Sequence, residues 1–216
     1  MGQLAGNSSI SIIGLGHMAS ALAGRALVGG NTVEIISRDR TKAEALAATL
    51  SGATVGTFGA APVGDLVILA VPYAVVLVVV QQFGDKLAGK LLIDITNPIN
   101  SSFTGFVTPS GSFGAQEIAK VAPTNAAIVK AFNTQSSHVL ATGSVEGQPL
   151  DVFLAGDDAQ AKTRVSALIE SLGLRPMDTG PLSMAWTLEH LALLSLGLVS
   201  HSIHHTNFSF GVSVFN

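Results

Sequence analysis

An apolar run that ends in a glycine-rich loop constrains the fold of this chain more than any other feature. The run ISII at residues 10–13 predicts a buried strand, and the loop Gly14 to Ala19 (GLGHMA) follows it directly and opens an Ala/Leu-rich helical segment. Gly14 permits a tight turn, Gly16 allows close approach to a pyrophosphate, and Ala19 is small enough for close packing of helix on strand. The pattern predicts the phosphate-binding loop of a dinucleotide-binding unit.

Short β-branched runs alternate with longer helical segments along most of the chain. Strands are predicted at residues 10–13, 33–36, 54–57, 66–71, 91–95, 127–132, 151–154 and 175–177, and helices at 18–28, 41–50, 73–83, 158–172 and from 184 to about 201. Continuous apolar strands that alternate with helices are typical of sheets covered on both faces. We therefore expect an α/β fold of the Rossmann type, with a doubly wound, mostly parallel sheet and a short C-terminal helical appendage.

The end of the second predicted strand carries a hydroxyl and a guanidinium where an NAD enzyme carries an acid. That acid lies about 20 positions beyond the glycines and binds the ribose 2′-hydroxyl. Here the region contains Ser37 and Arg38, with Lys42 shortly after. Arginine pairs bidentately with phosphate oxygens, so these residues favour the 2′-phosphate of NADP(H). The alternative is that Ser37 and Arg38 form an ordinary solvated turn.

Further strand ends are expected at the same edge of the sheet, where ligands of wound parallel sheets bind. Ala70, Val71, Pro72 and Tyr73 follow the fourth predicted strand, and we expect them to wall the ribose or nicotinamide. Asn97 and Pro98 follow the fifth, where Asn97 can bond the nicotinamide side or a backbone turn.

Two charged residues fall within or beside these predicted strands. We interpret Asp94 as a residue that stabilises a turn or a helix cap. The stretch Lys130 to Thr134, at the end of the sixth predicted strand, should lie near the nicotinamide face.

The domain boundary is predicted at residue 180. Residues 1–180 are expected to form the NADP-binding Rossmann domain, and residues 181–216 a helical segment with the acceptor site and a dimer contact. Residues 181–216 are too few for the long helical substrate domain of hydroxyacid dehydrogenases. Charged residues make up 12% of the chain, about half of the usual share of roughly 25%. We interpret this deficit as surface covered by a second subunit, and expect a homodimer.

Composition also limits the other partners. The chain has no Cys, which excludes disulfides, thiolate zinc sites and cysteine nucleophiles. Its formal net charge of −3 implies no cationic surface for nucleic acid. The longest apolar stretch, Leu66 to Val80, is shorter than the roughly 20 residues of a spanning helix, and residues 1–9 lack a signal-peptide pattern. We expect a cytoplasmic protein that binds no membrane and acts on a small-molecule acceptor.

No catalytic residue can be assigned from the sequence. His201 and His205 have the spacing of helical metal ligands, but no carboxylate follows, so a surface or interface cluster is favoured and no metal is expected. Glu189 and His190 could supply a proton to a substrate, but a partly buried structural pair at the subunit contact is favoured. The lack of an assignable catalytic residue agrees with direct hydride transfer, in which the protein orients the cofactor.

The Gly-x-Gly-x-x-Ala loop, Ser37-Arg38 and the stretches AVPY, DITNP and KAFNT together resemble the NADPH-dependent reductases of the deazaflavin coenzyme F420. The resemblance extends from Ile10 to about Val212. It implies a Rossmann core, a homodimer, and hydride exchange between NADP(H) and the deazaflavin ring, with F420 as co-substrate.

The resemblance also implies roles for individual residues. By position, Leu15, Gly16, His17 and Met18 match the pyrophosphate loop, and Ser37, Arg38 and Lys42 match the 2′-phosphate site. Pro72, Asn97 and Ala131 match the nicotinamide wall, and residues 133–137, including Asn133, Thr134 and Gln135, fall where the acceptor ring would stack. Residues 135–137 (QSS) are polar here, where an apolar platform is expected.

Two other functions stay open at this point. One is an NADPH-dependent reductase of an imine, a ketone or another small acceptor. The other is a non-catalytic NADP-binding module that senses the redox state of the cofactor. A reacting site needs an open face at the nicotinamide, so a side chain such as Phe132 filling that face would favour the sensor.

Overall fold

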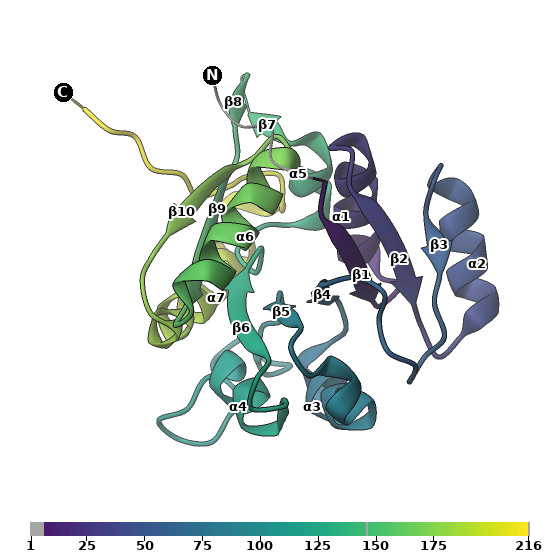
Figure 1. The fold of residues 1–216 in the computed structure, drawn as a ribbon. Coiled ribbons are helices and arrows are strands. Elements are labelled where there is room, and N and C mark those ends of the chain that lie inside the picture. Colours follow the sequence, from purple (N-terminus) through teal and green to yellow (C-terminus); the bar gives the residue numbers. More distant parts are fainter. Residues whose placement is uncertain (1–6, 146, 216) are drawn as a thin grey trace.

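A computed structural model describes residues 7–145 and 147–215. In these residues one sheet of eight strands has the order β10-β9-β6-β5-β4-β1-β2-β3 (Figure 1). Its strands are β1 (Ser9–Ile13), β2 (Thr32–Ile36), β3 (Thr54–Val55), β4 (Leu66–Leu69), β5 (Leu91–Asp94), β6 (Ala127–Ala131), β9 (Asp151–Gly156) and β10 (Arg175–Asp178). The short strands β7 (Ser144–Val145) and β8 (Gln148–Pro149) pair separately.

The described helices connect these strands and follow the last of them. The α-helices are α1 (His17–Val28), α2 (Arg40–Thr49), α3 (Tyr73–Phe83), α4 (Gly114–Val121), α5 (Ser137–Thr142), α6 (Ala159–Ser171) and α7 (Ala185–Leu198). Short 3₁₀ helices span Gly84–Leu87 and Leu182–Met184, and a π-helical turn, Val199–Ile203, extends α7.

Strand direction confirms the predicted doubly wound, mostly parallel sheet. The pairs from β3 across to β6 are parallel, β9 is antiparallel to β6, and β10 is parallel to β9. The strand order reverses between β1 and β4, which are neighbours in the sheet. This reversal leaves a crevice at the carboxyl ends of the strands, where ligands of such folds bind.

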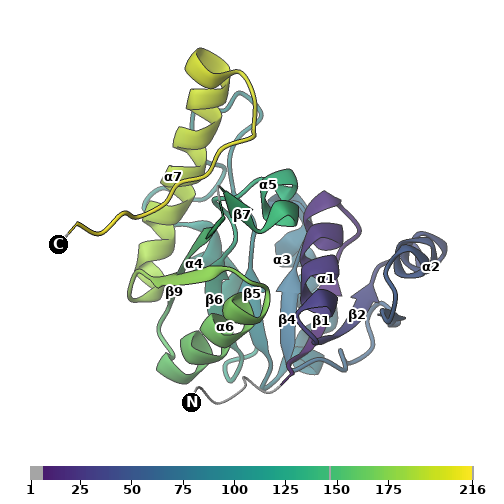
Figure 2. The same ribbon diagram turned by 90° about the horizontal axis from the view of Figure 1, so that it is seen from above.

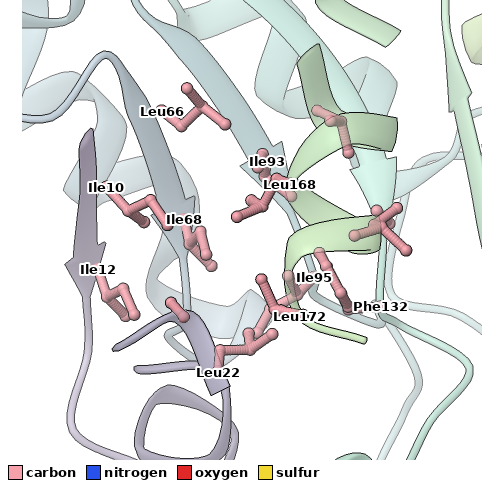
Figure 3. Close-up of a cluster of buried hydrophobic side chains, with 14 of the residues drawn as sticks. Ile10, Ile12, Leu22, Leu66, Ile68, Ile93, Ile95, Phe132, Leu168 and Leu172 are labelled. Atoms are coloured by element: carbon pink, nitrogen blue, oxygen red, sulfur yellow. The ribbon is translucent and has the colours of Figure 1, made fainter. Parts of the chain in front are cut away.

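One face of the sheet packs against α1, α5 and α6. Because successive side chains of a strand point to opposite faces, Ile10, Ile12 and Ile68 all point to this side. Figure 3 shows them in one cluster with Leu22 of α1 and Leu168 of α6. Full burial of each such side chain contributes about 1.5–3 kcal/mol.

The other face of the sheet packs against α3 and α4. Ile13, Val67 and Leu69 point to this side and meet Val76 and Phe83 of α3 in a second core cluster. The Val-rich run of α3 is a poor helix former, yet it forms the predicted helix because these valines are buried against the sheet. Two layers of helices thus enclose the sheet (Figure 1).

Two helices were not predicted from the sequence, and both are short. The N-terminus of α4 has no side-chain cap from its own neighbourhood; the Glu189 carboxylate, 75 residues later, accepts the Gly114 backbone N–H at 2.9 Å. In α5, the Ser136 hydroxyl accepts the Val139 N–H. A tertiary contact thus sets the start of α4.

The helix α7 projects beyond the sheet, and the residues after 204 run back alongside it (Figure 2). By length and composition alone, Leu182–Ile203 could cross a membrane. Its Glu189 is buried, however, and forms an ion pair inside the protein. That contact ties α7 to the sheet.

Candidate active site

A cleft of about 720 Å³ lies at the carboxyl ends of β1, β4 and β5, where the strand order reverses. We call it the glycine-loop cleft. It is lined by Gly16, His17, Met18, Ala70, Val71, Pro72, Tyr73, Ala74, Ile95, Thr96, Asn97, Ile99, Asn100, Ser101 and Val107. The stretches predicted from three strand ends therefore share one cleft.

Gly14 and Gly16 of the loop are suited to their positions for different structural reasons. Gly14 has a φ of +141°, and a Cβ added there would lie 2.0 Å from the carbonyl oxygen of Ala70. Gly16 precedes α1, and a Cβ added there would meet no atom within 4 Å. No side chain caps α1, so its first N–H groups are available to an anion. The open backbone at Gly16 leaves room for the predicted pyrophosphate, whose binding there stays a prediction.

The predicted 2′-phosphate residues lie beside this loop, at the carboxyl end of β2. The Gly14 N–H donates to the Ile36 carbonyl at 3.0 Å, which joins the two strand ends. Lys42 is engaged by Asp39: its Nζ lies 3.1 Å from Asp39 Oδ2. The exposed Arg38 forms no ion pair in the described part of the chain, which leaves its guanidinium available to a phosphate.

Asp39 was not considered in the sequence prediction. Its carboxylate accepts the Lys42 backbone N–H at 3.0 Å and caps α2. That hydrogen bond, together with the Lys42 ammonium, lowers the pKa of Asp39. The Asp39 carboxylate, just after the end of β2, is therefore already paired with Lys42.

Two asparagines join the ends of β5 and β6 at the inner end of the cleft. The Asn97 side-chain amide donates to the Asn133 carbonyl at 2.8 Å, and the Asn133 amide donates to Asn97 Oδ1 at 2.9 Å. The Asn133 amide also donates to the Leu188 carbonyl of α7 at 3.0 Å. These bonds hold Asn97 in a defined position at the predicted nicotinamide wall.

A second cavity of about 350 Å³ adjoins the cleft, because Asn97 and Ile99 line both. We call it the side pocket. It is lined by Asn97, Ile99, Phe103, Asn133, Thr134, Gln135, Ser136, Ala192, Ser195, Leu196, Val199, Thr206 and Phe208. The predicted acceptor residues Asn133, Thr134 and Gln135 all lie in its wall.

Comparison with known proteins agrees with this geometry. A family model described as "NADP oxidoreductase coenzyme F420-dependent" matches residues 9–98, the part that includes β1 to β5 and most of the cleft. An F420-dependent NADP reductase from Methanothermobacter thermautotrophicus is 30% identical over 207 residues, which cover 88% of this chain and 88% of that protein. This chain belongs to the F420-dependent NADP oxidoreductase family.

Two further similarities differ in how much of the relative they cover. The metalloreductase STEAP3 of Rattus norvegicus is 29% identical over 191 residues, 85% of this chain but 36% of that protein, so the chain spans about a third of its length. A crystal structure of a putative F420-dependent NADP reductase from Arthrobacter sp. FB24 has a TM-score of 0.85 and 26% identity, covering 96% of this chain and 100% of that one. The chain is an NADP(H)-dependent oxidoreductase, as its sequence predicted.

This oxidoreductase contains a buried ion cluster that the sequence analysis missed. Lys130 Nζ lies 2.9 Å from Asp94 Oδ2, 2.8 Å from Glu189 Oε1 and 2.6 Å from the Thr96 carbonyl. All three charged side chains are buried. The cluster joins β5, β6 and α7 behind Asn97. The signal was present: Asp94 and Lys130 interrupt two apolar runs that turn out to pair in register.

The cluster refines three sequence interpretations. Asp94 does stabilise a turn, because its Oδ1 accepts the Thr96 N–H at 2.8 Å, but it also binds Lys130. Lys130 belongs to the strand end predicted near the nicotinamide, yet its own side chain is fully buried. Glu189 binds Lys130 and the α4 N-terminus, while His190 Nδ1 lies 2.7 Å from the Trp186 carbonyl. Glu189 therefore has a structural role inside the fold, but it does not form the expected pair with His190.

Few titratable side chains line the glycine-loop cleft and the side pocket in the described residues. In the described residues, His17 and Tyr73 are the titratable residues that line the cleft, and none lines the side pocket. Burial raises the pKa of Tyr73 to about 12, and the negative charges of Glu117, Glu189 and Asp94 add to the effect. Tyr73 therefore stays protonated at neutral pH, and the walls are suited to orienting a ligand rather than to exchanging protons with it.

Phe132 does not fill the nicotinamide side of the site. Its φ of +61° turns the chain at the end of β6, and its side chain is fully buried in the core with Ile95 and Val139. It lines neither cavity. Phe132 therefore gives no support to the sensor.

Three other predicted cofactor residues lie beside the cleft rather than in its wall. Ala131 and Pro98 are buried, and Leu15 packs against the first core cluster. None of the three lines either cavity. Their contact with a coenzyme stays a prediction.

Proposed function

We propose that this oxidoreductase exchanges a hydride between NADP(H) and the deazaflavin coenzyme F420. The observation that carries the proposal is the side pocket, which opens beside the glycine-loop cleft at Asn97 and Ile99. Hydride transfer requires donor and acceptor in direct contact, so an acceptor pocket must adjoin the nicotinamide end of the cleft. When bound, NADPH supplies the hydride, and the proton that completes the reduction of the ring comes from water.

The roles of the protein in this proposal are binding and orientation. The backbone at Gly16 and the N-terminus of α1 hold the pyrophosphate, and Arg38 pairs with the 2′-phosphate. Asn97, held by Asn133, bonds the nicotinamide side. Ala131 and Pro98 support this wall from behind.

A reductase of imines or ketones is the second candidate, and the lining of the side pocket argues against it. Reduction of a C=N or C=O bond is assisted by a positioned proton donor. In the described residues no titratable side chain lines the side pocket. A deazaflavin ring, which delocalises the added electron pair, depends less on such a donor.

The assembly that we propose rests on α7. Its outer face exposes Trp186 and Leu194, by 48% and 53% of their surface. Exposed apolar surface on a chain with 12% charged residues supports a homodimer formed through residues 181–216, the segment that also lines the side pocket. We propose that the dimer is cytoplasmic and binds no nucleic acid or membrane.

A spectroscopic assay tests the proposed reaction. The visible absorbance of oxidised F420 is followed after NADPH and enzyme are added, with NADH in place of NADPH as the control. We expect bleaching with NADPH and much slower bleaching with NADH. If F420 keeps its absorbance while an imine or ketone is reduced, the proposal is wrong and the second candidate replaces it.

A further inference from the structure

The buried ion cluster of Asp94, Lys130 and Glu189 lies directly behind the wall of the glycine-loop cleft. Asp94 Oδ1 accepts the Thr96 N–H at 2.8 Å, and Lys130 Nζ donates to the Thr96 carbonyl at 2.6 Å. Thr96 and Asn97 line the cleft, at the end where we propose that the nicotinamide binds. The charges of the cluster therefore act on this end of the cleft from just behind its wall.

Glu189 also approaches the cleft from the side of Tyr73. A Cβ added at Gly114 would lie 2.9 Å from Glu189 Oε1 and 3.1 Å from Tyr73 Cε2. The missing side chain of Gly114 thus lets the carboxylate come close to the ring of a residue that lines the cleft. Glu189 is 1% exposed, so little water lies around its carboxylate to screen the charge.

The carboxyl groups of the cluster are bound as anions, because every partner of their oxygens is a donor. Asp94 accepts from the Thr96 N–H and from Lys130. Glu189 accepts from Lys130 and from the first N–H groups of α4. A protonated carboxyl would need an acceptor, which none of these partners offers. Two anions and one cation leave the cluster with one net negative charge.

Neighbouring positive groups do not cancel this charge. The N-terminus of α4 offsets at most about half of a unit charge. In the described residues no Lys or Arg lines the cleft, and His17 belongs to the glycine loop rather than to this end. Tyr73 reports the resulting sign: burial is the first cause that raises its pKa, and the negative charges of three carboxylates, among them Asp94 and Glu189, add to the rise. This end of the cleft is therefore electrostatically negative.

Charge at this end distinguishes the two redox states of the coenzyme. The nicotinamide ring is a cation in NADP⁺ and neutral in NADPH, while the phosphates and the sugars are the same in both. A negative charge shielded from water therefore favours the cationic ring. One unit charge at a distance of about 10 Å changes the affinity for that ring by about three- to tenfold.

We propose that Asp94 and Glu189 are specificity-determining residues for the redox state of the coenzyme, and that their charge strengthens the binding of NADP⁺ relative to NADPH. Such a preference assists hydride donation, in which the reduced ring gives up a hydrogen nucleus with two electrons and becomes a cation, while the acceptor is reduced. The inference rests on the proposed position of the nicotinamide at Asn97, and it holds whichever acceptor takes the hydride.

Charge-removing and charge-keeping variants of Glu189 test the proposal. Glu189→Gln removes the charge at nearly constant size, whereas Glu189→Asp keeps the charge but shortens the side chain, so both disturb the contacts with α4 and Lys130. Asp94→Asn removes the other anion and serves if Glu189→Gln does not fold, and Glu170→Gln, exposed on α6, is the control. Each protein is titrated with NADP⁺ and, separately, with NADPH by isothermal titration calorimetry, and circular dichroism checks the fold.

We expect Glu189→Gln and Asp94→Asn to raise the ratio of the NADP⁺ dissociation constant to the NADPH dissociation constant by about three- to tenfold. Glu189→Asp and Glu170→Gln should keep the ratio of the wild type, even where Glu189→Asp is less stable. A purely structural role of Glu189 would weaken the binding of both coenzymes together and leave the ratio unchanged.

An unchanged ratio in both charge-removing variants, or an equal shift in Glu189→Asp, would overturn the inference. If the wild type reduces F420 while its charge-removing variants keep the ratio, the proposed function stands and this inference fails. If the ratios shift as expected in a protein that does not reduce F420, this inference is supported and the proposed function is refuted.

Discussion

At the scale of single residues, we propose that the choice between NADPH and NADH depends on one guanidinium, that of Arg38. Arg38 is exposed at the end of β2, while the neighbouring Lys42 is already paired with Asp39. We expect Arg38→Ala to raise the dissociation constant of NADPH tenfold or more, because a charge-assisted hydrogen bond contributes about 1.5–3 kcal/mol. The affinity for NADH should hardly change. Isothermal titration calorimetry with both coenzymes measures the difference.

Arg40→Ala is the matched control for Arg38→Ala. It removes the same charge nearby, but Arg40 Nε already lies 2.8 Å from Glu44 Oε1 of the same helix. Its effect on NADPH should be small. An equal loss of NADPH and NADH affinity in Arg38→Ala would show that this residue does not read the 2′-phosphate.

A second residue-scale prediction concerns Lys130. Its removal leaves Asp94 and Glu189 buried without their cation, and breaking a buried ion pair in this way costs about 3–5 kcal/mol. We expect Lys130→Met to lower the free energy of unfolding in urea by that amount. Lys120→Met, which breaks the exposed pair with Glu117, should cost less than about 1 kcal/mol. Similar values for the two variants would contradict the role given to the buried cluster.

At the scale of elements, the Asp151 carboxylate links stability to pH. It accepts the Val212 N–H of the C-terminal tail at 2.7 Å. Burial opposes ionisation of Asp151, but hydrogen bonds from Arg175 and from Val212 N–H outweigh it and lower the pKa of the carboxyl. A carboxyl whose pKa is lower in the folded state stabilises the fold above its unfolded pKa of about 3.9 and loses that contribution as pH falls through the folded value.

The Asp151→Asn variant isolates this contribution. We expect it to be less stable than the wild type at pH 6 and to lose less stability between pH 6 and pH 3, as measured by urea unfolding. Asp85→Asn, at an exposed position, is the control and should follow the wild type. If Asp151→Asn loses as much unfolding free energy between pH 6 and pH 3 as the wild type does, Asp151 contributes no pH-dependent stability.

Elements whose signal is local were predicted from the sequence, and elements that depend on distant residues were not. Continuous apolar residues indicate the strands β1 and β4, and the length of its apolar run indicates α3. The apolar face and the Asp158 cap indicate α6. The helix α4 begins at a glycine and is capped by Glu189 from α7, a contact that no local pattern reveals.

The same distinction applies to the site. The glycine loop and the strand ends that line the cleft follow from local motifs and from the topology of wound sheets. The aromatic wall of the side pocket does not, because Phe103 and Phe208 are far apart in the chain and line one pocket only in the folded protein. The ion cluster likewise requires the register of β5 and β6 to be known.

At the scale of the whole molecule, the surface has an unpartnered apolar face on α7. We expect light scattering at micromolar concentration to return the mass of a dimer, and Leu194→Glu to shift it toward that of a single chain, because a charge would then be buried at the contact. Val28→Glu, on α1 and 89% exposed, is the control and should leave the mass unchanged. A wild type with the mass of one chain would refute the dimer.

The central claim is that the glycine-loop cleft and the side pocket bring a reduced nicotinamide and a deazaflavin ring into direct contact. Single-turnover transfer from NADPH deuterated at the reactive position tests it most directly, with mass spectrometry of the reduced F420. The claim predicts that, with NADPH labelled on the transferred face, the deuterium appears in the deazaflavin product in unlabelled water. Reduced F420 without deuterium from NADPH labelled on either face, or no reduced F420 at all, would contradict it.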